Sequence, residues 1–360
     1  MHPFIQEARS VVAARVQSYL DDAGEQTLSF EPWGPDLRAR LRDYALRGKL
    51  IRGAMVGLGY RVFRPHGDLP SACADAGAAM ELLQSFLLIH DDIMDQDDTR
   101  RGGPAVHAQY RDETPTGRER SRYQYGLSMG ICAGDVSAFL AIHLLSQLEA
   151  PTETRGRITE LTAREITLCG LAQMQDVHHG YVDSAEDAAI LNVYTYKTGR
   201  YTFSLPLMIG AILAGADDQA LHGLGRLGEQ LGRIFQIRDD QLGIFGSEEQ
   251  TGKPVGSDIR EDKKTLFRNG LVRKLGADEP ARQAFGSNHV DQDTVDLVRT
   301  ALHEQGILAA VETVVYHDAD SARDEIRAIS APPEGKEALT TLLEYKLVMS
   351  PETAWWKCCS

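Results

Sequence analysis

Two clusters of aspartates lie far apart in this sequence, and each follows an apolar stretch. The first is Asp91-Asp92-Ile93-Met94-Asp95, and the second is Asp239-Asp240. If residues 82–95 form a helix, Asp91 and Asp95 lie one turn apart and about 40° apart around its axis. Carboxylates this close repel one another unless a cation lies between them, and oxygen ligands favour Mg²⁺ or Ca²⁺. Because Mg²⁺ is typically held by one or two carboxylates plus substrate phosphates, the clusters predict a shared metal site and a phosphorylated ligand.

A simpler interpretation is that each acidic pair is only a solvated helix end. The residues before the first cluster, Leu-Leu-Gln-Ser-Phe-Leu-Leu-Ile-His at 82–90, are almost all apolar. They place the carboxylates at the end of a buried helix. Burying an unpaired charge is costly, so this context favours the metal site.

Basic residues accompany both acidic clusters. Lys49 and Arg52 would lie on one face at the start of a helix, after Gly48, which permits close approach of the backbone to an anion. A helix N-terminus also offers N–H groups and the positive end of the helix dipole to a phosphate. Further basic residues follow along the chain, namely Arg100, Arg101, Lys197, Lys253, Lys263 and Lys264. One charged pair is usually solvated surface, but this alternation of acids and bases suits a polyanionic substrate.

The composition is that of a folded protein, and its charge excludes two kinds of partner. The 360 residues, 42% of them hydrophobic and 25% charged, suffice for one large domain or two ordinary ones. A formal net charge of −14 argues against a nucleic-acid-binding face and against simple adsorption to anionic lipid.

We expect a cytoplasmic protein without an integral membrane segment. No uninterrupted apolar run approaches the roughly 20 residues that span a bilayer, and the first residues lack a basic region followed by an apolar one. The five cysteines include no C-x-x-C pair, so neither a zinc site nor a disulfide framework is indicated. Cys358 and Cys359 are interpreted as part of a tail.

Apolar residues recur at helical spacing along nearly the whole chain, which predicts an all-α fold in a single large domain. The predicted helices are residues 3–22, 35–46, 49–63, 69–95, 123–148, 153–178, 185–198, 202–213, 217–245, 291–304, 307–328 and 334–349. Breaks are expected at 64–67, 102–104, 113–117 and 246–262, where Gly and Pro gather.

In their order along the chain, these motifs resemble those of the trans (all-E) isoprenyl diphosphate synthases, from Gly48 to about Thr265. Gly48-Lys49-x-x-Arg52 is similar to the family's GKxxR, Asp91-Asp92-x-x-Asp95 to its first aspartate-rich motif, residues 97–102 to the segment after it, and residues 235–242 to its second. Gly134-Asp135, Gln173-x-x-Asp176 and Lys197-Thr198 resemble shorter signatures. The second motif departs from DDxxD because its third acidic position is Gly243, as in many bacterial and archaeal members, so Asp239 gains importance.

The resemblance implies one all-helical domain over residues 1–360, with a helical bundle of the type I isoprenoid synthase fold around a central cavity, usually as a homodimer. It also assigns roles. Magnesium would be held by Asp91, Asp95 and Asp239, with Asp92 and Asp240 in support. Isopentenyl diphosphate would be bound by Lys49, Arg52, Gln84 and Arg101. The allylic diphosphate would be bound by Arg100, Lys197, Gln236 and Lys253, with Lys263 closing over it. Gln236 and Thr198 would direct oxygen dipoles at the allylic cation.

The resemblance also bears on product length. Phe86 lies five residues before Asp91, about 7.5 Å lower along a helix, where its ring could form the floor of the cavity for the prenyl tail. An aromatic there with Leu87 beside it resembles the archaeal type of geranylgeranyl diphosphate synthase, which implies a C20 product. Phe86 could also be an ordinary core residue, and facing helices can set the floor.

Other functions stay open. A farnesyl (C15) or C25 diphosphate synthase would share the same motifs. A class I terpene cyclase also uses an aspartate-rich helix and magnesium, but the Gly48–Arg52 segment and the second acidic pair favour two diphosphates. A non-catalytic subunit of a heteromeric synthase is disfavoured because both acidic pairs are present.

Overall fold

The computed structural model describes residues 3–114, 117–246, 255–287 and 289–347. Almost all of the described elements are helices, which confirms the predicted fold class. The chain divides into two compact units, the first formed by Met1–Glu160 with Pro206–Ala216 and the second by Leu161–Leu205 with Asp217–Ser360. The single domain expected from the sequence stays a prediction, and each unit is described by itself.

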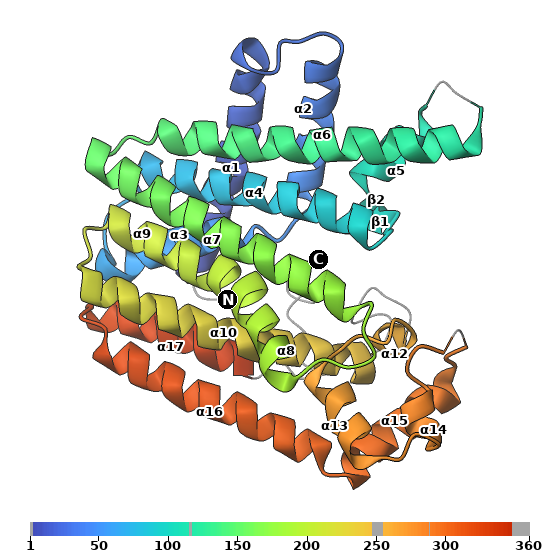
Figure 1. The fold of residues 1–360 in the computed structure, drawn as a ribbon. Helices are drawn as coiled ribbons and strands as arrows, with labels where there is room; N and C mark the ends of the chain where they lie inside the picture. Colours follow the sequence, from blue (N-terminus) through green and yellow to red (C-terminus); the bar gives the residue numbers. More distant parts are fainter. Residues whose placement is uncertain (1–2, 115–116, 247–254, 288, 348–360) are drawn as a thin grey trace. The chain divides into compact units, whose positions relative to one another are not determined.

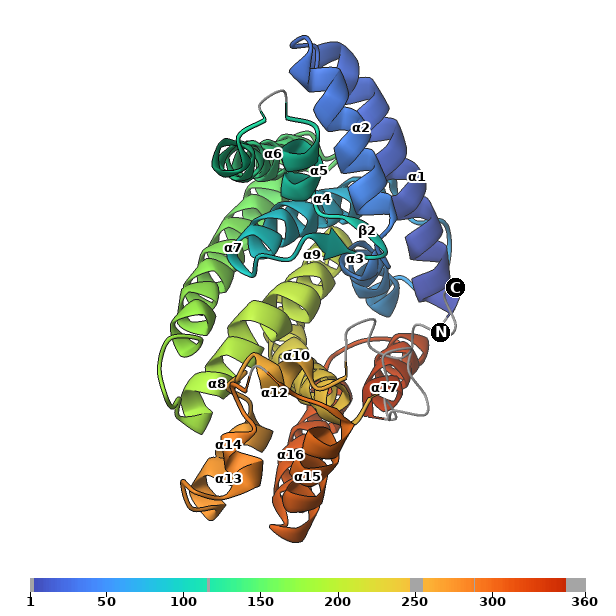
Figure 2. The ribbon, with the colours of Figure 1, turned by 90° about the vertical axis from the view of Figure 1, so that its right-hand side faces the viewer.

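The first unit is built around α4 (Ser71–Met94), most of whose side chains are buried. The other elements of the unit are α1 (Pro3–Gln26), α2 (Trp33–Leu46), α3 (Ile51–Phe63), α5 (Val106–Asp112), α6 (Glu119–Ser146), the start of α7 (Thr152–His179) and nearly all of α9 (Leu205–Leu213). α4 packs against α1, α2, α3, α5 and α6, and it lies alongside α6 in Figure 1. α1 and α2 run side by side in Figure 2. This packing buries Asp75, Glu81 and Asp92 of α4, whereas Asp91 is half-buried and Asp95, directly after the helix, is exposed.

A tight hairpin follows the acidic end of α4. Its strands, β1 (Thr99–Arg100) and β2 (Gly103–Pro104), pair antiparallel with Arg100 opposite Gly103. The two residues between them, Arg101 and Gly102, both have positive φ, at 53° and 74°, as a two-residue turn of type I′ requires. Arg100, at the end of the first strand, pairs with Asp92 of α4.

The second unit is organised around α10 (Asp218–Phe245), which begins at the N-cap Asp217. It packs against the π-helix η1 (Tyr194–Ser204) and against α16 (Ile307–Ala328). The contact with η1 is between backbones, since a Cβ atom on Gly232 would lie 2.0 Å from the Cα atom of Gly199. The rest of the unit comprises most of α7, α8 (Asp187–Val193), α12 (Ser257–Arg260), α13 (Leu266–Lys274), α14 (Pro280–Gln283), α15 (Gln292–Glu304) and α17 (Pro333–Leu347).

The predicted helices correspond to observed ones with shifted ends, apart from one region. Helices were predicted at 185–198 and 202–213, whereas α8, η1 and α9 form one uninterrupted helical segment from Asp187 to Leu213. The π-helix arises where the i→i+4 ladder widens, a feature that hydrophobic periodicity does not encode. Four short helices were not predicted from the sequence: α5, α12, α13 and α14, with 7, 4, 9 and 4 residues. Helices of this length are too short to show helical periodicity. Met349, at the end of the last predicted helix, lies outside the described residues.

Two described helices, α4 and α6, are long and apolar enough to cross a bilayer by length and composition alone. The most apolar part of α4 is 83% buried, so its place in the protein core explains its apolar composition. The corresponding part of α6 is 39% buried. The core helices of soluble proteins meet the same criterion, so these two give no clear membrane span.

Candidate active site

The acidic end of α4 divides into a buried and an accessible part. Asp92 is fully buried, with 0% of its surface exposed. Its Oδ2 accepts a hydrogen bond of 2.8 Å from the Tyr44 hydroxyl, and its Oδ1 pairs with the Arg100 guanidinium at 2.5 Å. Burial raises the pKa of Asp92, against the opposing effects of Arg100 and Tyr44. Both oxygens of Asp92 are thus engaged by Tyr44 and Arg100, and its supporting role at a metal site stays a prediction.

The other two acids of the cluster face outward. Asp91 is half-buried and Asp95 is exposed, and they are one turn apart, with the Asp95 N–H donating to the Asp91 carbonyl at 2.8 Å. Both lie at the C-terminal end of a 24-residue helix. The negative end of the helix dipole lies there, so it disfavours the two carboxylates and favours a cation bound beside them. Oxygen donors in this setting fit Mg²⁺.

A pocket of about 350 Å³ lies next to this acidic end, within the first unit. It is lined by Arg47, Lys49, Leu50, Ile51, Arg52, Glu81 and Arg101. Four of these side chains are cationic and one is a carboxylate, so the pocket has a net positive charge within an acidic protein. Since Arg100 pairs with Asp92 and the next residue, Arg101, lines the pocket, the hairpin connects the pocket to the acidic cluster.

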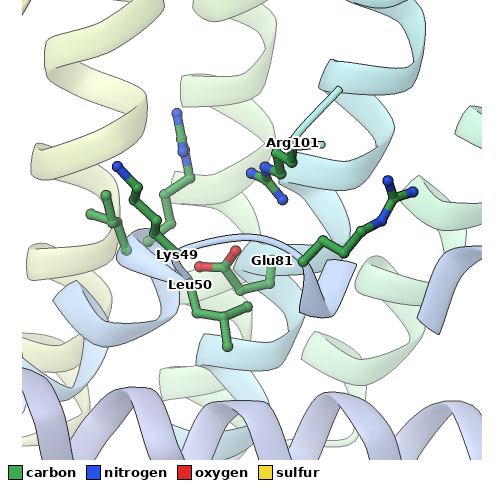
Figure 3. A pocket seen from close by; sticks show the side chains of 7 residues that line it. Lys49, Leu50, Glu81 and Arg101 are labelled. Carbon is green, nitrogen blue, oxygen red and sulfur yellow. The ribbon is translucent and has the colours of Figure 1, made fainter. Parts of the chain in front are cut away.

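Glu81 is a buried carboxylate in this cationic pocket, and it was not among the residues predicted from the sequence. In Figure 3 its carboxylate is seen between Lys49 and Arg101. Burial raises the pKa of Glu81, whereas the Gly53 N–H, which donates to Oε1 at 2.7 Å, and the charges of Arg52 and Arg101 lower it. Glu81 thus accepts a hydrogen bond from a backbone N–H group in the first turn of α3. The sequence had predicted that the N–H groups of this turn would bind a phosphate. Side chains are left as the main anion ligands of the pocket.

Three other predicted residues of this unit lie on α4. Gln84 is buried, three residues after Glu81, and Phe86 and Leu87 are half-buried. The Phe86 ring lies edge-on to the imidazole of His90, with centroids 4.9 Å apart and an interplanar angle of 73°.

The second unit surrounds Asp240 with donors. Asp240 is 1% exposed and its carboxylate accepts hydrogen bonds from the Tyr194 hydroxyl, from Lys263 Nζ at 2.9 Å and from Gln236 Nε2 at 3.2 Å. Burial lowers the pKa of Lys263, but the charges of Asp240 and Asp258 raise it well above its ordinary value, so the ammonium stays charged. Asp239, the preceding residue on α10, is exposed.

The π-helix carries Tyr194, Lys197 and Thr198. Thr198 donates its hydroxyl hydrogen to Gln236 Oε1 at 3.2 Å, which extends the hydrogen-bonded chain that leads to Asp240. Lys197 Nζ donates to Asp176 Oδ2 at 2.7 Å, so two of the shorter signatures contact each other. Lys253, predicted to bind the allylic diphosphate, lies outside the described residues.

Asp258 accounts for the glycine at the third position of the second motif. A Cβ atom on Gly243 would lie 2.3 Å from Asp258 Oδ2, so the Asp258 carboxylate occupies the place of a side chain at 243. Burial raises the pKa of Asp258 to about 6, despite the opposing charge of Lys263, whose Nζ lies 3.8 Å from Oδ2. A third carboxylate therefore accompanies Asp239 and Asp240, supplied from α12 instead of α10. Asp258 lies between Lys253 and Lys263 in the sequence, which does not reveal that it contacts Gly243.

Within each unit, the structure brings some of the predicted residues together: Lys49, Arg52 and Arg101 around the pocket of the first, and Thr198, Gln236, Asp240 and Lys263 in the second. Among the described residues no three His, Cys, Asp or Glu side chains already converge as a metal site. A magnesium site completed by substrate phosphates needs only one or two carboxylates from the protein, so the residues fit such a site.

Comparison with known proteins identifies the family of this chain. The model of the polyprenyl synthetase family matches residues 35–303, which include most of both units. The chain belongs to the polyprenyl synthetase family. The resemblance inferred from the motifs is therefore confirmed.

Individual relatives extend this result. A geranylgeranyl diphosphate synthase of Sulfolobus acidocaldarius is 39% identical over 53% of this chain, and the match spans about half of that relative, 54%. A short chain isoprenyl diphosphate synthase of Methanothermobacter thermautotrophicus is 32% identical, with 92% of this chain and 94% of the relative covered. Other relatives are named geranylfarnesyl and nonaprenyl diphosphate synthases.

A solved structure also agrees with the fold. The geranylgeranyl pyrophosphate synthase of Corynebacterium glutamicum, complexed with isoprenyl diphosphate and magnesium, is 27% identical with a TM-score of 0.85, over 96% of this chain and 99% of that one.

Proposed function

We propose that this polyprenyl synthetase family member is a short-chain prenyltransferase. It condenses isopentenyl diphosphate head-to-tail with an allylic diphosphate, with the help of Mg²⁺. The observation that carries the proposal is the cationic pocket of the first unit, joined through consecutive arginines to an acidic helix end. Such a pocket suits a diphosphate, while the acids suit the metal of a second diphosphate.

In this proposal the pocket binds isopentenyl diphosphate through Lys49, Arg52 and Arg101, and Glu81 keeps the two guanidinium groups in place. The allylic diphosphate is bound by Arg100, Lys197 and Lys263, and Lys253 belongs to the same group by resemblance. Mg²⁺ held by Asp91, Asp95 and Asp239 would stabilise the negative charge that develops on the leaving pyrophosphate. That both acidic clusters serve one diphosphate is part of the proposal.

The reaction then needs little further chemistry from the side chains. The C–O bond of the allylic diphosphate breaks, and its electron pair leaves with pyrophosphate. Thr198 and Gln236 direct oxygen dipoles at the allylic cation, and the double bond of isopentenyl diphosphate attacks it. The proton lost from the adduct passes to the departing pyrophosphate, so no His or Glu base is required.

For the product we propose geranylgeranyl diphosphate, with Phe86 as the floor of the cavity. The support is the half-buried aromatic ring one and a half turns before Asp91, with the smaller Leu87 beside it. C15 and C25 products are the alternatives. Phe86→Ala would then lengthen the product, and an unchanged product would remove Phe86 as the floor.

We further propose a cytoplasmic homodimer that uses the exposed apolar face of α6. Phe139 is 70% exposed, and Ile131 and Ile142 lie on the same helix with 46% and 47% exposure, which is unusual for large apolar side chains on a monomer. Sedimentation of the purified chain should give twice the monomer mass, and Phe139→Glu should give the monomer. A monomeric wild-type chain would contradict the dimer.

Incubation of the purified chain with labelled isopentenyl diphosphate and each allylic starter tests the activity, with chromatography of the products. We expect condensation that requires both substrates and stops when a chelator removes the metal. A hydrocarbon or alcohol formed from the allylic diphosphate alone would favour a terpene cyclase, and no product at all would favour a non-catalytic subunit.

A further inference from the structure

His90 lies between the product-length residue Phe86 and helix α6. It follows Phe86 by one turn on α4, and its imidazole meets the edge of the Phe86 ring at a centroid distance of 4.9 Å. Its Nε2 lies 3.2 Å from the Ile131 carbonyl oxygen and 3.6 Å from Asp135 Oδ1. With the proton on Nε2, the imidazole donates to α6 and packs its ring against Phe86 on α4.

Gly134 makes this arrangement possible. A Cβ atom there would lie 2.4 Å from His90 Nε2 and 2.5 Å from its Cδ2, so the imidazole rests directly on the bare Cα atom of α6. Any larger residue would force His90 to rotate. Gly134 and Asp135 contact His90 in different ways: Gly134 leaves space for the imidazole, and Asp135 places a negative charge near Nε2.

We propose that His90, seated on Gly134, is a positioning residue that fixes the Phe86 ring and thereby helps to set product length. The inference rests on the proposed function, because it assumes that Phe86 is the floor of the prenyl cavity. Phe86 is half-buried, and a half-buried side chain can change rotamer when a growing chain presses on it. The edge-on contact with His90 opposes this movement, since such ring pairs have a preferred geometry.

Product length in four variants tests the proposal: Phe86→Ala, His90→Ala, Gly134→Ala and the double variant Phe86→Ala/His90→Ala. His143→Ala, on α6 beside Tyr19, and Gly156→Ala, where a Cβ atom meets nothing within 4 Å, are matched controls. Each chain is incubated with isopentenyl diphosphate and one allylic starter, and the ratio of longer product to the wild-type product is measured. Circular dichroism and thermal unfolding check the fold.

We expect His90→Ala and Gly134→Ala each to raise that ratio by about 2- to 10-fold, the factor that corresponds to loss of one aromatic pair. Phe86→Ala should raise it at least as much, and adding His90→Ala to it should change nothing further, because His90 acts through Phe86. The control variants should keep the wild-type ratio. A general loss of stability would lower the total rate without changing the ratio, so the ratio separates positioning from a structural role.

Three results would overturn the proposal. The first is a wild-type ratio in His90→Ala while Phe86→Ala lengthens the product. The second is further lengthening by His90→Ala in the Phe86→Ala background, which would make His90 a floor residue itself. The third is no change in Phe86→Ala. A wild-type chain that forms no condensation product refutes the proposed function, and this inference with it.

Discussion

Replacement of Asp258 by asparagine should raise the free energy of unfolding of the metal-free chain at pH 8. Burial raises the pKa of this carboxyl from 3.8 to about 6, and the charges of Asp240 and Asp239 act in the same direction, against Lys263. A carboxyl whose pKa is higher in the folded than in the unfolded chain reduces stability once it is ionised in both. At about 1.4 kcal/mol per pKa unit, this penalty is about 3 kcal/mol.

The penalty has a defined pH window. Below about pH 4, near the unfolded pKa of 3.8, the carboxyl is protonated in both states, and the penalty vanishes. Between about pH 4 and pH 6 the unfolded chain ionises first, so the wild-type chain loses stability relative to the variant. Above about pH 6 the difference is constant. Asparagine has nearly the same shape as a protonated aspartic acid, so it removes the penalty without leaving a cavity.

Urea unfolding followed by circular dichroism at pH 4, 6 and 8 in the presence of a chelator measures this difference. Asp68→Asn, at an exposed position between α3 and α4, is the matched control and should show no such pH dependence. Magnesium with pyrophosphate should stabilise the wild-type chain more than Asp258→Asn, because a bound cation relieves the penalty. If the variant gains nothing at pH 8, or gains equally at pH 4 and pH 8, the electrostatic account of this site is wrong.

Three further substitutions test the site. Asp91→Ala should lower kcat by roughly 100-fold or more with an unchanged circular dichroism spectrum; wild-type turnover would remove Asp91 from the metal site. Tyr194→Phe should lower the free energy of unfolding by about 1.5–3 kcal/mol, because Asp240 loses a buried hydrogen bond to a charged group, and an unchanged urea midpoint would contradict this. Gly243→Asp should destabilise the chain by about 1–3 kcal/mol, because its side chain overlaps Asp258, and Gly243→Asp/Asp258→Gly should recover most of the loss.

Sequence reasoning was most successful where a residue acts through its position on a helix. The spacing of Asp91 and Asp95 and the apolar stretch before them sufficed to predict an acidic helix end, which α4 provides. Glu81 and Asp258 were missed for a different reason. Each gains its role from a neighbour remote in sequence, the N–H of Gly53 for one and the bare Cα atom of Gly243 for the other. Such pairs become visible only when the packing of helices is known.

In both units, the two residues of the Asp-Asp pair differ in burial: the second is buried and the first is not. In each, the second aspartate is buried and bound to a tyrosine and a cation: Tyr44 and Arg100 for Asp92, Tyr194 and Lys263 for Asp240. A buried carboxylate with these partners cannot turn towards a ligand without leaving a cation and a hydroxyl unpaired, which is costly. The first aspartate of each pair points about 100° away around its helix, towards the surface. We therefore propose that consecutive acids have different roles: the first would bind the metal, and the second holds the cation that would meet the diphosphate.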